Sequence, residues 1–377
     1  MSQPEFKILI SGGGTGGHIF PAIAIADALR KAVPACKILF VGASGKMEME
    51  KVPQAGYPIE ALWISGFQRS FSLKNLSFPF KLISSMLKAH RIIRNFRPDV
   101  VVGVGGFASG PTLKAAAGQG IPIVIQEQNS FPGVTNKLIA RQADRICVAY
   151  DGLERWFPAG KIVKTGNPVR ENVVNIMGKY DEAFEYFGLK KGKLVLLIVG
   201  GSQGSLSINQ SLVLHLAAFV ETGLQLIWQT GKLFAEKAKS AIQTNVPSED
   251  QQNFHVHDFI TRMDLAYAAA DIVISRAGAI AISELSAVGK PCILIPLPSA
   301  AEDHQTKNAQ ALADKQAAIL LKDSDAAEQL GTIVADLANN NEKRQRLSQN
   351  IVQFAITGSA DRIAGEIIKL IQQKNGF

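Results

Sequence analysis

Two glycine-rich loops constrain the fold of this 377-residue chain more than any other feature. The loops read SGGGTGGH at 11–18 and VGGSQGS at 199–205, and each follows a short apolar run and precedes a helical pattern. Branched apolar runs of this kind are typical of strands that are buried on both faces of a sheet. Glycines after such strands leave backbone N–H groups free at a helix N-terminus, where the helix dipole favours an anion. Two such units predict two Rossmann-like domains, with something bound and reacted in the cleft between them.

The composition is that of an ordinary soluble globular protein, with 47% hydrophobic and 19% charged residues. Cys36, Cys147 and Cys292 are widely spaced and lie in or beside apolar runs. They are therefore interpreted as small buried side chains, and neither a disulfide framework nor a zinc site is expected. The N-terminus has no signal-peptide pattern, and no run of 18 apolar residues occurs. We expect a cytoplasmic protein without a transmembrane helix.

Strand-like and helical patterns alternate along the chain, which predicts parallel sheets flanked by helices. Helical patterns include 17–33 and 133–142. The expected strands lie near 6–11, 37–42, 59–63, 99–104, 122–126, 145–149, 162–165, 193–199, 224–229, 253–256, 271–275, 291–295 and 317–321. The turn sequence Gly166-Asn167-Pro168 is expected to join the domains. The predicted division is an N-terminal domain at 1–167, a C-terminal domain at 168–354, and a helix at 355–377 that packs back toward the first.

The formal net charge of +8 is unevenly distributed. No acidic residue occurs between Glu60 and Asp99, where basic residues alternate with aromatic and aliphatic ones. Such a segment can lie against an anionic membrane surface, which is one interpretation. The alternative is a core helix over Lys81–Arg97 with a solvated basic face. Nucleic acid is not expected, because no recognised motif accompanies the charge. The residues expected to form the membrane patch are Phe71, Lys74, Leu76, Phe78 and Lys81.

A dinucleotide-dependent dehydrogenase is a minor alternative. Gly12, Gly14 and Gly17 fit the G-x-G-x-x-G fingerprint, which also requires an acidic residue at the end of the second strand to hold the ribose. That strand ends near Ser44, and the first acid, Glu48, lies beyond it. The second glycine loop does not fit the fingerprint at all.

Seven sequence blocks, in register along almost the whole chain, resemble the MurG family of peptidoglycan glycosyltransferases. The blocks are GGGTGGHIFPA at 12–22, VGVGGFASGP at 102–111, QEQNSFPGVTNK at 126–137, TGNPVR at 165–170, GGSQGS at 200–205, RAGAIAISEL at 276–285 and EDHQTKNA at 302–309. The resemblance implies an α/β protein of the GT-B fold, with two Rossmann-like parallel-sheet domains facing a cleft. It also implies inverting transfer of GlcNAc from UDP-GlcNAc to the MurNAc 4-hydroxyl of lipid I, giving β-1,4-linked lipid II in peptidoglycan synthesis.

The same resemblance implies a peripheral protein on the cytoplasmic face of the inner membrane. The implied partners are UDP-GlcNAc, membrane-bound lipid I, anionic lipids and other cell-wall synthesis proteins. Two enzyme alternatives share the fold. A UDP-GlcNAc 2-epimerase needs no membrane-facing patch, and a glycolipid synthase acting on diacylglycerol needs no acceptor diphosphate site. A nucleotide-sugar sensor without activity is a further class, which leaves His18 and Asn129 unexplained.

The resemblance places the donor mainly in the C-terminal domain. Glu284 is expected to accept hydrogen bonds from the ribose, Phe259 and Ile260 to flank the uracil, and Gln305 to recognise a sugar hydroxyl. The other residues expected to bind UDP-GlcNAc are Thr15, Gly16, Gly17, Asn129, Arg170, Ser202, Gln203, Gly204, Arg276, Gly278 and Ala279. Ala277 departs from the expected serine, so one hydroxyl contact is in question.

Departure of UDP develops negative charge on the diphosphate, which fixed donors or a metal must stabilise. The sequence has no obvious DxD-like pair at a strand end, whereas the loop at 202–205, a helix N-terminus and Arg276 can supply donors. We therefore expect no bound metal and no other cofactor.

On the acceptor side, His18 closes the first glycine loop at a helix start. The helix dipole disfavours imidazolium there, so His18 is the leading candidate for the general base on the acceptor hydroxyl. The alternative is a histidine that only packs or caps the loop. Asn129 is the second candidate catalytic residue, by resemblance. The residues expected to bind the acceptor are Gly105, Gly106, Phe107 and Glu127.

Overall fold

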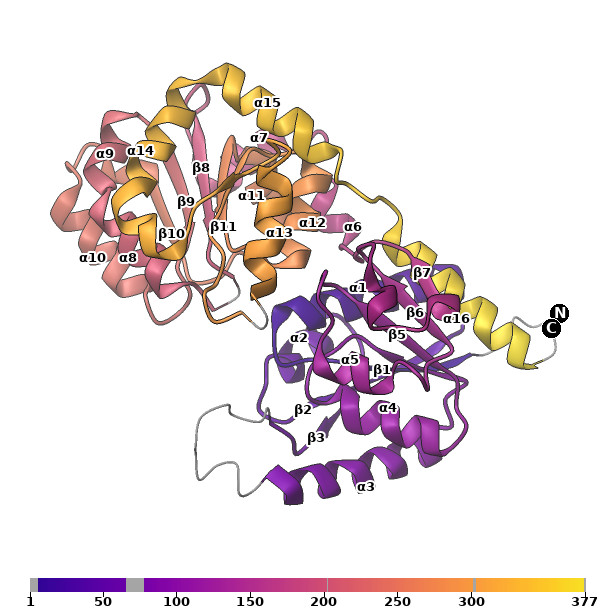
Figure 1. The fold of residues 1–377 in the computed structure, drawn as a ribbon. Helices are drawn as coiled ribbons and strands as arrows, with labels where there is room; N and C mark the ends of the chain where they lie inside the picture. The colour runs from indigo at the N-terminus through magenta and orange to yellow at the C-terminus, as the bar shows by residue number, and fades with distance from the viewer. Residues whose placement is uncertain (1–5, 66–77, 202, 301–302, 376–377) are drawn as a thin grey trace. The chain divides into compact units, whose positions relative to one another are not determined.

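The computed structural model describes residues 6–65, 78–201, 203–300 and 303–375. The chain divides into two compact units, each built around one parallel sheet (Figure 1). Residues 1–170 and 356–377 make up the first unit, and residues 171–355 make up the second. The predicted α/β class with two Rossmann-like sheets is confirmed.

The sheet of the first unit has seven strands in the order β3-β2-β1-β4-β5-β6-β7, and all their pairings are parallel. Its strands are β1 (Lys7–Ser11), β2 (Lys37–Ala43), β3 (Ile59–Leu62), β4 (Val100–Gly103), β5 (Ile123–Glu127), β6 (Arg145–Val148) and β7 (Ile162–Lys164). The chain runs outward from β1 in one direction and then returns to continue from β4 in the other. The order of the strands therefore reverses between β1 and β4, where doubly wound sheets bind ligands.

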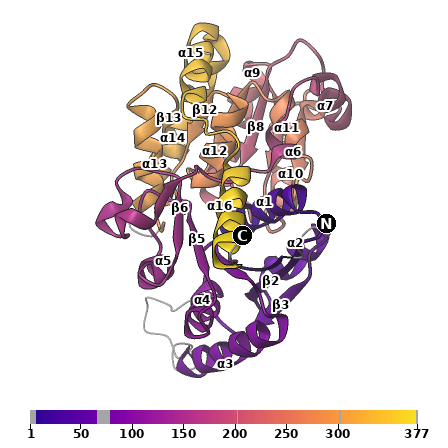
Figure 2. The same cartoon turned by 90° about the vertical axis from the view of Figure 1, so that its right-hand side faces the viewer.

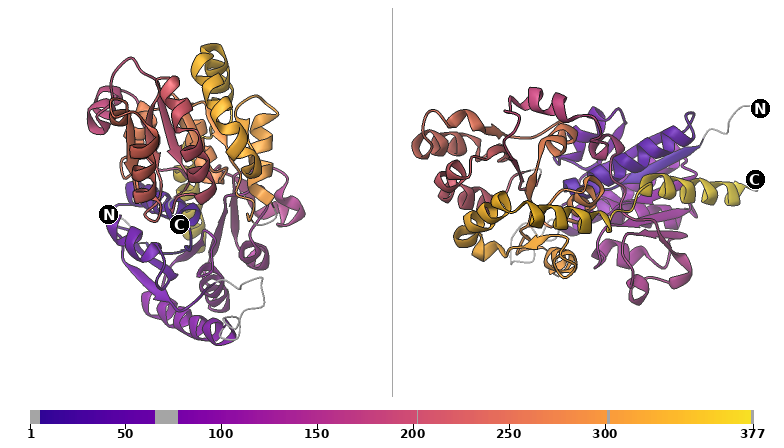
Figure 3. Two further views of the ribbon diagram at one scale, coloured as in Figure 1. Left: turned by 90° about the vertical axis from the view of Figure 1, so that its left-hand side faces the viewer. Right: turned by 90° about the horizontal axis from the view of Figure 1, so that it is seen from above.

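Helices cover both faces of this sheet, because alternate side chains of each strand point to opposite faces. Ile8 and Ile10 belong to a core shared with α1, α2 and α16, whereas Leu9 belongs to one shared with α3, α4 and α5. The C-terminal helix α16 packs alongside α1 (Figures 2 and 3). The helices are α1 (Gly16–Ala32), α2 (Glu48–Gln54), α3 (Phe78–Phe96), α4 (Ser109–Gly118), α5 (Val134–Ile139) and α16 (Ser359–Asn375).

The sheet of the second unit repeats the same order with six parallel strands, β10-β9-β8-β11-β12-β13. Its strands are β8 (Val195–Val199), β9 (Gln225–Gln229), β10 (Phe254–His257), β11 (Ile272–Ser275), β12 (Cys292–Leu294) and β13 (Ile319–Leu320). The strand order reverses here between β8 and β11. The second glycine loop follows β8, so each glycine-rich loop stands at the reversal point of its own sheet.

Two core clusters again lie on opposite faces. Val195 and Leu197 pack with α7, α11, α12, α13 and α15, whereas Leu196 and Ile198 pack with α8, α9, α10 and α14. The helices are α6 (Glu171–Val174), α7 (Tyr180–Phe187), α8 (Leu206–Leu214), α9 (Leu216–Glu221), α10 (Ala235–Asn245), α11 (Met263–Ala269), α12 (Ala279–Val288), α13 (His304–Ala313), α14 (Ala326–Asn339) and α15 (Asn341–Val352).

The cysteines are free thiols, and Cys147 and Cys292 are buried as expected while Cys36 is only half-buried. Burial raises the pKa of both buried thiols to about 12, which leaves them unreactive near neutral pH. Within the described ranges, no helix combines the length and the apolar character that crossing a bilayer requires.

Candidate functional site

A buried carboxylate accepts a hydrogen bond from the backbone of the first glycine loop. Glu48, the first residue of α2, accepts hydrogen bonds from the N–H groups of Gly14 at 3.0 Å and Ala43 at 2.9 Å. A Cβ atom on Gly13 would lie 2.2 Å from a Glu48 carboxylate oxygen. One loop amide is therefore already bonded to a protein anion, which argues further against a dinucleotide site. Sequence reasoning noticed Glu48 only as an acid in the wrong place for a ribose.

The loop after β4, which contains Gly105 and Gly106, packs backbone to backbone against the first glycine loop. A Cβ on Gly106 would lie 2.2 Å from the carbonyl oxygen of Gly13, and one on Gly12 would lie 2.1 Å from the Val104 side chain. Gly105 and Gly106 both have positive φ, at 92° and 88°, a region that favours glycine. The two loops therefore form one continuous surface at the reversal point of the sheet.

His18 lies in the first turn of α1, where these loops meet. Its Nδ1 is 3.1 Å from the Thr15 hydroxyl, and a Cβ on Gly105 would lie 2.8 Å from its Nε2. If Nδ1–H donates to Thr15, Nε2 is left with the lone pair that a general base requires. Gly16 and Gly17 belong to the same helical turn, and Phe107, 47% exposed, flanks Gly14. The structure thus brings together several of the predicted acceptor-site residues.

Glu127 lies at the end of β5 and is buried, with both carboxylate oxygens occupied by protein donors. Oε1 accepts from the backbone and the side chain of Asn129, and Oε2 accepts from the Gly133 N–H and the Asn136 side chain, at distances of 2.8–3.2 Å. Burial raises the pKa of Glu127, although these donors act in the opposite direction. The geometry suits a residue that orients Asn129 better than one that itself contacts an acceptor.

Three buried amide side chains that sequence reasoning missed support this region. Gln128 donates to the carbonyl of Val104 at 2.8 Å and to Gln126 at 2.5 Å, and Asn167 donates to the Gln128 carbonyl at 3.1 Å. The available signal was a run of polar residues at the end of an apolar strand, Gln126 to Gln128, and the turn that contains Asn167. Their hydrogen bonds connect the loop after β4 to the loop after β5.

Arg170 is oriented by an aromatic ring of α1. Its guanidinium carbon lies 4.3 Å from the centre of the Phe20 ring, within cation–π range. Its buried Nε makes no hydrogen bond within the described part of the chain. An anion or a carbonyl is the natural partner for that donor.

In the second unit, the glycine loop after β8 packs against the loop after β9. A Cβ on Gly204 would lie 1.9 Å from the Thr230 carbonyl oxygen, and one on Gly231 would lie 2.0 Å from the Gln203 carbonyl oxygen. The Ser205 hydroxyl caps α8 by accepting from the Ile208 N–H. The loop is therefore anchored on both sides at the amino end of a helix. Ser202 lies outside the described residues.

Arg276 follows β11 and ties this loop to the rest of the sheet edge. Its Nη1 and Nη2 donate at 2.5–3.1 Å to the carbonyl oxygens of Ile295 and Pro296, the carboxylate of Asp323 and the hydroxyls of Ser205 and Ser207. Both Nη1 and Nη2 of Arg276 thus donate hydrogen bonds to acceptors of the second unit. Direct donation from Arg276 to a departing diphosphate stays a prediction, because its Nη1 and Nη2 groups already donate to protein acceptors. In this structure Arg276 holds the loop.

Helix α12 brings Glu284 close to Tyr267. Gly278 and Ala279 begin the helix, and Ala277, where a serine was expected, is completely buried. Glu284 is 9% exposed and accepts a hydrogen bond from the Tyr267 hydroxyl at 3.0 Å. One oxygen of the carboxylate is therefore bonded to a neutral donor.

The segment after β10 and the start of α13 hold the other predicted donor-site residues. The N–H of Ile260 donates to the Gln229 side chain at 2.8 Å, so a base would have to be read through other groups of Phe259 and Ile260. The Oε1 of Gln305 accepts from the Leu297 N–H at 2.9 Å, so recognition of a sugar by this side chain would use its amide nitrogen. A sugar hydroxyl is a suitable acceptor for that nitrogen.

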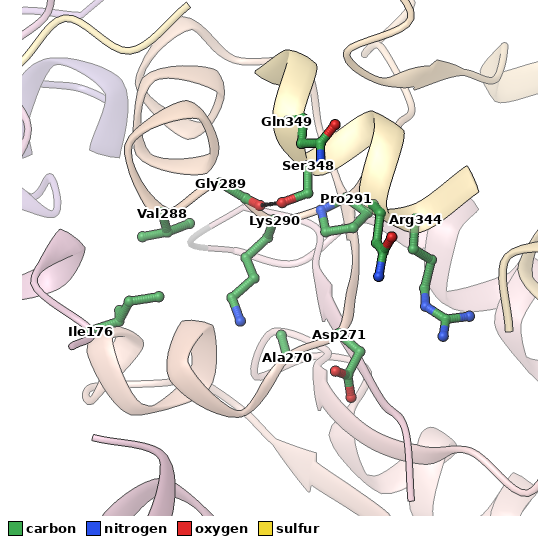
Figure 4. Close-up of a pocket in the computed structure, with 11 residues that line it drawn as sticks. Ile176, Ala270, Asp271, Val288, Gly289, Lys290, Pro291, Arg344, Ser348 and Gln349 are labelled. Carbon is green, nitrogen blue, oxygen red and sulfur yellow. Dashed lines mark hydrogen bonds between the residues drawn. The ribbon is translucent and has the colours of Figure 1, made fainter. Parts of the chain in front are cut away.

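Within the described residues, no three His, Cys, Asp or Glu side chains gather to hold a metal ion. A cavity of about 610 Å³ in the second unit is lined by Lys290, Asp271, Arg344, Ser348 and others (Figure 4). Asp271 and Pro291 directly precede β11 and β12, so this cavity lies at the amino ends of the strands. Ligands of parallel sheets bind at the carboxyl ends, so the cavity is not the donor site.

Family models match both units. The model of the glycosyltransferase family 28 N-terminal domain matches residues 8–148, and that of the family's C-terminal domain matches residues 195–363. A protein of Flavobacterium psychrophilum is 52% identical over 370 residues, covering 98% of this chain and 99% of the relative. One of Bacteroides thetaiotaomicron is 52% identical over 374 residues, covering 99% and 100%. Both are named UDP-N-acetylglucosamine--N-acetylmuramyl-(pentapeptide) pyrophosphoryl-undecaprenol N-acetylglucosamine transferase.

Solved structures of glycosyltransferases and related enzymes have the same fold as this chain. The crystal structure of MurG from Acinetobacter baumannii superposes with a TM-score of 0.73 at 30% identity, covering 97% of this chain and 100% of that one. A UDP-GlcNAc 2-epimerase from Neisseria meningitidis, bound to UDP-GlcNAc, superposes with a TM-score of 0.67 at 15% identity, covering 97% and 100%. The latter similarity shows the shared fold alone.

Proposed function

This chain belongs to glycosyltransferase family 28 and, within it, to the MurG group, and we propose that it transfers GlcNAc from UDP-GlcNAc to the MurNAc 4-hydroxyl of lipid I. The observation that carries this proposal is the identity of about 50% with transferases of that name over nearly the full chain. The expected product is lipid II with a β-1,4 linkage, formed with inversion at the sugar. The two doubly wound sheets are those of the GT-B fold.

The first unit supplies the residues proposed to act on the acceptor. Removal of a proton from the 4-hydroxyl makes its oxygen a better nucleophile, and His18 Nε2 is the proposed base. The Thr15 hydroxyl, 3.1 Å from Nδ1, fixes the orientation of the ring. Asn129, held by Glu127, is proposed to orient a substrate hydroxyl, and Glu127 acts as its positioning residue.

The second unit supplies the residues proposed to bind the donor. The described part of the glycine loop after β8 leads into the amino end of α8, where backbone N–H groups are proposed to stabilise negative charge on the diphosphate. The proposed ribose ligand is Glu284, the proposed uracil segment is Phe259–Ile260, and Gln305 is proposed to contact the sugar. We propose that these protein donors stabilise the leaving group without a metal.

Treatment with EDTA is expected to leave most of the transfer activity, because loop amides and a helix N-terminus stabilise the diphosphate in this account. The measurement is the initial rate of transfer with EDTA, compared with the rate in excess Mg²⁺. Complete loss of activity, restored only by a divalent ion, would contradict a metal-independent mechanism.

The epimerase alternative shares the donor and the fold. Incubation with UDP-GlcNAc alone separates the two functions, because an epimerase produces UDP-ManNAc and a transferase requires the acceptor. The low identity to the epimerase, 15%, favours transfer. A diacylglycerol glycolipid synthase is tested by offering that lipid as the acceptor.

We further propose that the protein binds the membrane surface through α3, as a peripheral protein on the cytoplasmic face of the inner membrane. Phe80, Ile83 and Leu87 lie on one face of this helix and are 71%, 60% and 68% exposed. The opposite side of α3, including Ala89 and Ile93, is buried on the sheet. The buried side of the helix belongs to the core, and the exposed apolar side chains support the proposed membrane contact.

The patch predicted from sequence is located only in part. Phe71, Lys74 and Leu76 lie outside the described residues. Phe78 is half-buried, and Lys81 donates to the Ser65 hydroxyl at 3.1 Å. The remaining basic side chains of α3, which can meet anionic head groups, are Lys88, Arg91 and Arg94.

Changing Phe80, Ile83 and Leu87 together to serine is expected to abolish the salt-resistant part of binding to anionic vesicles. Charge contributes roughly 1 kcal/mol per basic residue near the surface and is screened by salt, whereas inserted apolar side chains are not. Sedimentation with anionic and neutral vesicles at rising salt measures both contributions. Transfer to a short-chain acceptor in solution should be unaffected.

A matched control replaces three exposed apolar residues of the second unit, Met177, Leu214 and Val352, by serine. This variant should bind vesicles as the wild type does. If the α3 variant also binds vesicles as the wild type does, the side chains of Phe80, Ile83 and Leu87 do not insert into the membrane.

A further inference from the structure

Strand β9 of the second unit begins and ends with a buried glutamine. Gln225 is 1% exposed and Gln229 is 3% exposed. The stretch between them, Leu226-Ile227-Trp228, is apolar and also buried. Because both glutamines are buried, neither side-chain amide can form its hydrogen bonds with water. Each must find its hydrogen-bond partners within the protein.

Gln229 finds its partners in two different loops. Its Nε2 donates to the carbonyl oxygen of Gly201 at 2.9 Å, and its Oε1 accepts from the N–H of Ile260 at 2.8 Å. Gly201 lies in the glycine loop after β8, and Ile260 lies in the segment after β10. One side chain therefore connects the loop assigned to the diphosphate with the segment assigned to the uracil.

The sheet topology explains why this residue can reach both. β9 is the strand between β8 and β10, and Gln229 is in register with Val199 on one side and His257 on the other. All three residues are the last of their strands. The last residue of β9 therefore lies next to both loops, the one that follows β8 and the one that follows β10.

The chemistry of the side chain also fits this place. The two contacts need one donor and one acceptor, which a carboxamide supplies from adjacent atoms. Gly201 has a φ of 96°, a backbone conformation that residues other than glycine rarely adopt. Gln229 therefore bonds to a carbonyl group in a turn that requires glycine. The bond to the Ile260 N–H is buried and the bond to the Gly201 carbonyl is partly buried, so loss of the amide leaves a buried N–H unsatisfied and releases the carbonyl of the loop.

We propose that Gln229 is a positioning residue for the donor: it fixes the distance between the diphosphate loop and the uracil-binding segment, so that both ends of UDP bind at once. This inference rests on the proposed function, because it takes the assignment of these two loops from it. In this proposal Gln229 acts through the two loops and contacts neither the acceptor hydroxyl nor the sugar carbon that reacts.

Gln225 provides a matched control at the other end of the same strand. Its Oε1 accepts from the Lys190 N–H at 2.6 Å, and its Nε2 donates to the Lys190 carbonyl at 2.9 Å. It has the same residue type, similar burial and the same number of hydrogen bonds to backbone groups. Its partner, however, lies before β8, away from the loops that follow the carboxyl ends of the strands.

The test compares UDP binding to the wild type, Gln229→Met and Gln225→Met by calorimetry. Methionine keeps the length and volume of glutamine and removes both hydrogen bonds. We expect the Kd for UDP to rise about tenfold in Gln229→Met and to change by less than twofold in Gln225→Met, while both variants lose similar thermal stability. In transfer assays Gln229→Met should raise the KM for UDP-GlcNAc and leave kcat and the acceptor KM nearly unchanged.

Equal Kd values for the wild type and folded Gln229→Met would overturn the inference, and so would equal weakening in both variants. If Gln229→Met does not fold, Gln229→Glu is measured instead, because its carboxylate still accepts from Ile260 and no longer donates to Gly201. Its Kd should also rise about tenfold, and an unchanged value would overturn the inference. Failure of the wild type to bind UDP at all would contradict the proposed function instead.

Discussion

Replacing His18 by alanine is expected to lower kcat by roughly 10²–10⁴-fold, with the KM for UDP-GlcNAc nearly unchanged. The effect follows from the position of the ring, with Nδ1 held by Thr15 and Nε2 at the meeting point of two glycine loops. Loss of a general base removes an interaction that is made in the transition state and leaves donor binding intact. Steady-state kinetics with a short-chain lipid I analogue measure both constants.

His90 supplies the control for this substitution. It is an exposed histidine of α3 in the same unit, and its ring lies beside Gln119 rather than beside the glycine loops. His90→Ala should retain the wild-type kcat. A loss of tenfold or less in His18→Ala would mean that the ring only packs the loop.

Replacing Glu284 by alanine is expected to raise the KM for UDP-GlcNAc about 100-fold. The carboxylate is proposed to accept from two ribose hydroxyls, and hydrogen bonds to a charged group contribute roughly 1.5–3 kcal/mol each. At the lower end of that range, two such bonds correspond to about 3 kcal/mol, or two decades in affinity. The donor KM and the Kd for UDP should rise together, because UDP retains the ribose.

Tyr267 supplies the comparison that separates binding from structure. Its hydroxyl donates to Glu284 at 3.0 Å, so Tyr267→Phe removes this hydrogen bond and keeps the carboxylate. We expect a far smaller rise in donor KM for this variant than for Glu284→Ala. Similar kinetics in the two variants, or an unchanged donor KM in Glu284→Ala, would remove Glu284 from the donor site.

Local patterns predicted the sheets well, because each strand is a short apolar run that carries its own signal. The runs at 7–11 and 195–199 are branched, apolar and followed by glycine, and both are strands within a residue or two of the expected bounds. Helix ends were less predictable. The helix expected at 133–142 ends at Ile139, and α3 begins at Phe78 rather than Lys81.

The partners of site residues could not be predicted, because they lie far away in the sequence. Arg276 bonds to Ser205 and Asp323, which are 71 and 47 positions away, and these contacts depend on which strands become neighbours. Glu48 and Gln229 carried no chemical motif of their own. Their roles appear only when the loops they hold are brought together by the fold.

The central claim is tested most directly by offering labelled UDP-GlcNAc to the purified protein with and without a short-chain lipid I analogue. The account predicts label in the lipid product only when the acceptor is present, release of one UDP per sugar transferred, and a β-linked disaccharide by NMR. Conversion of UDP-GlcNAc to UDP-ManNAc without any labelled lipid would contradict it.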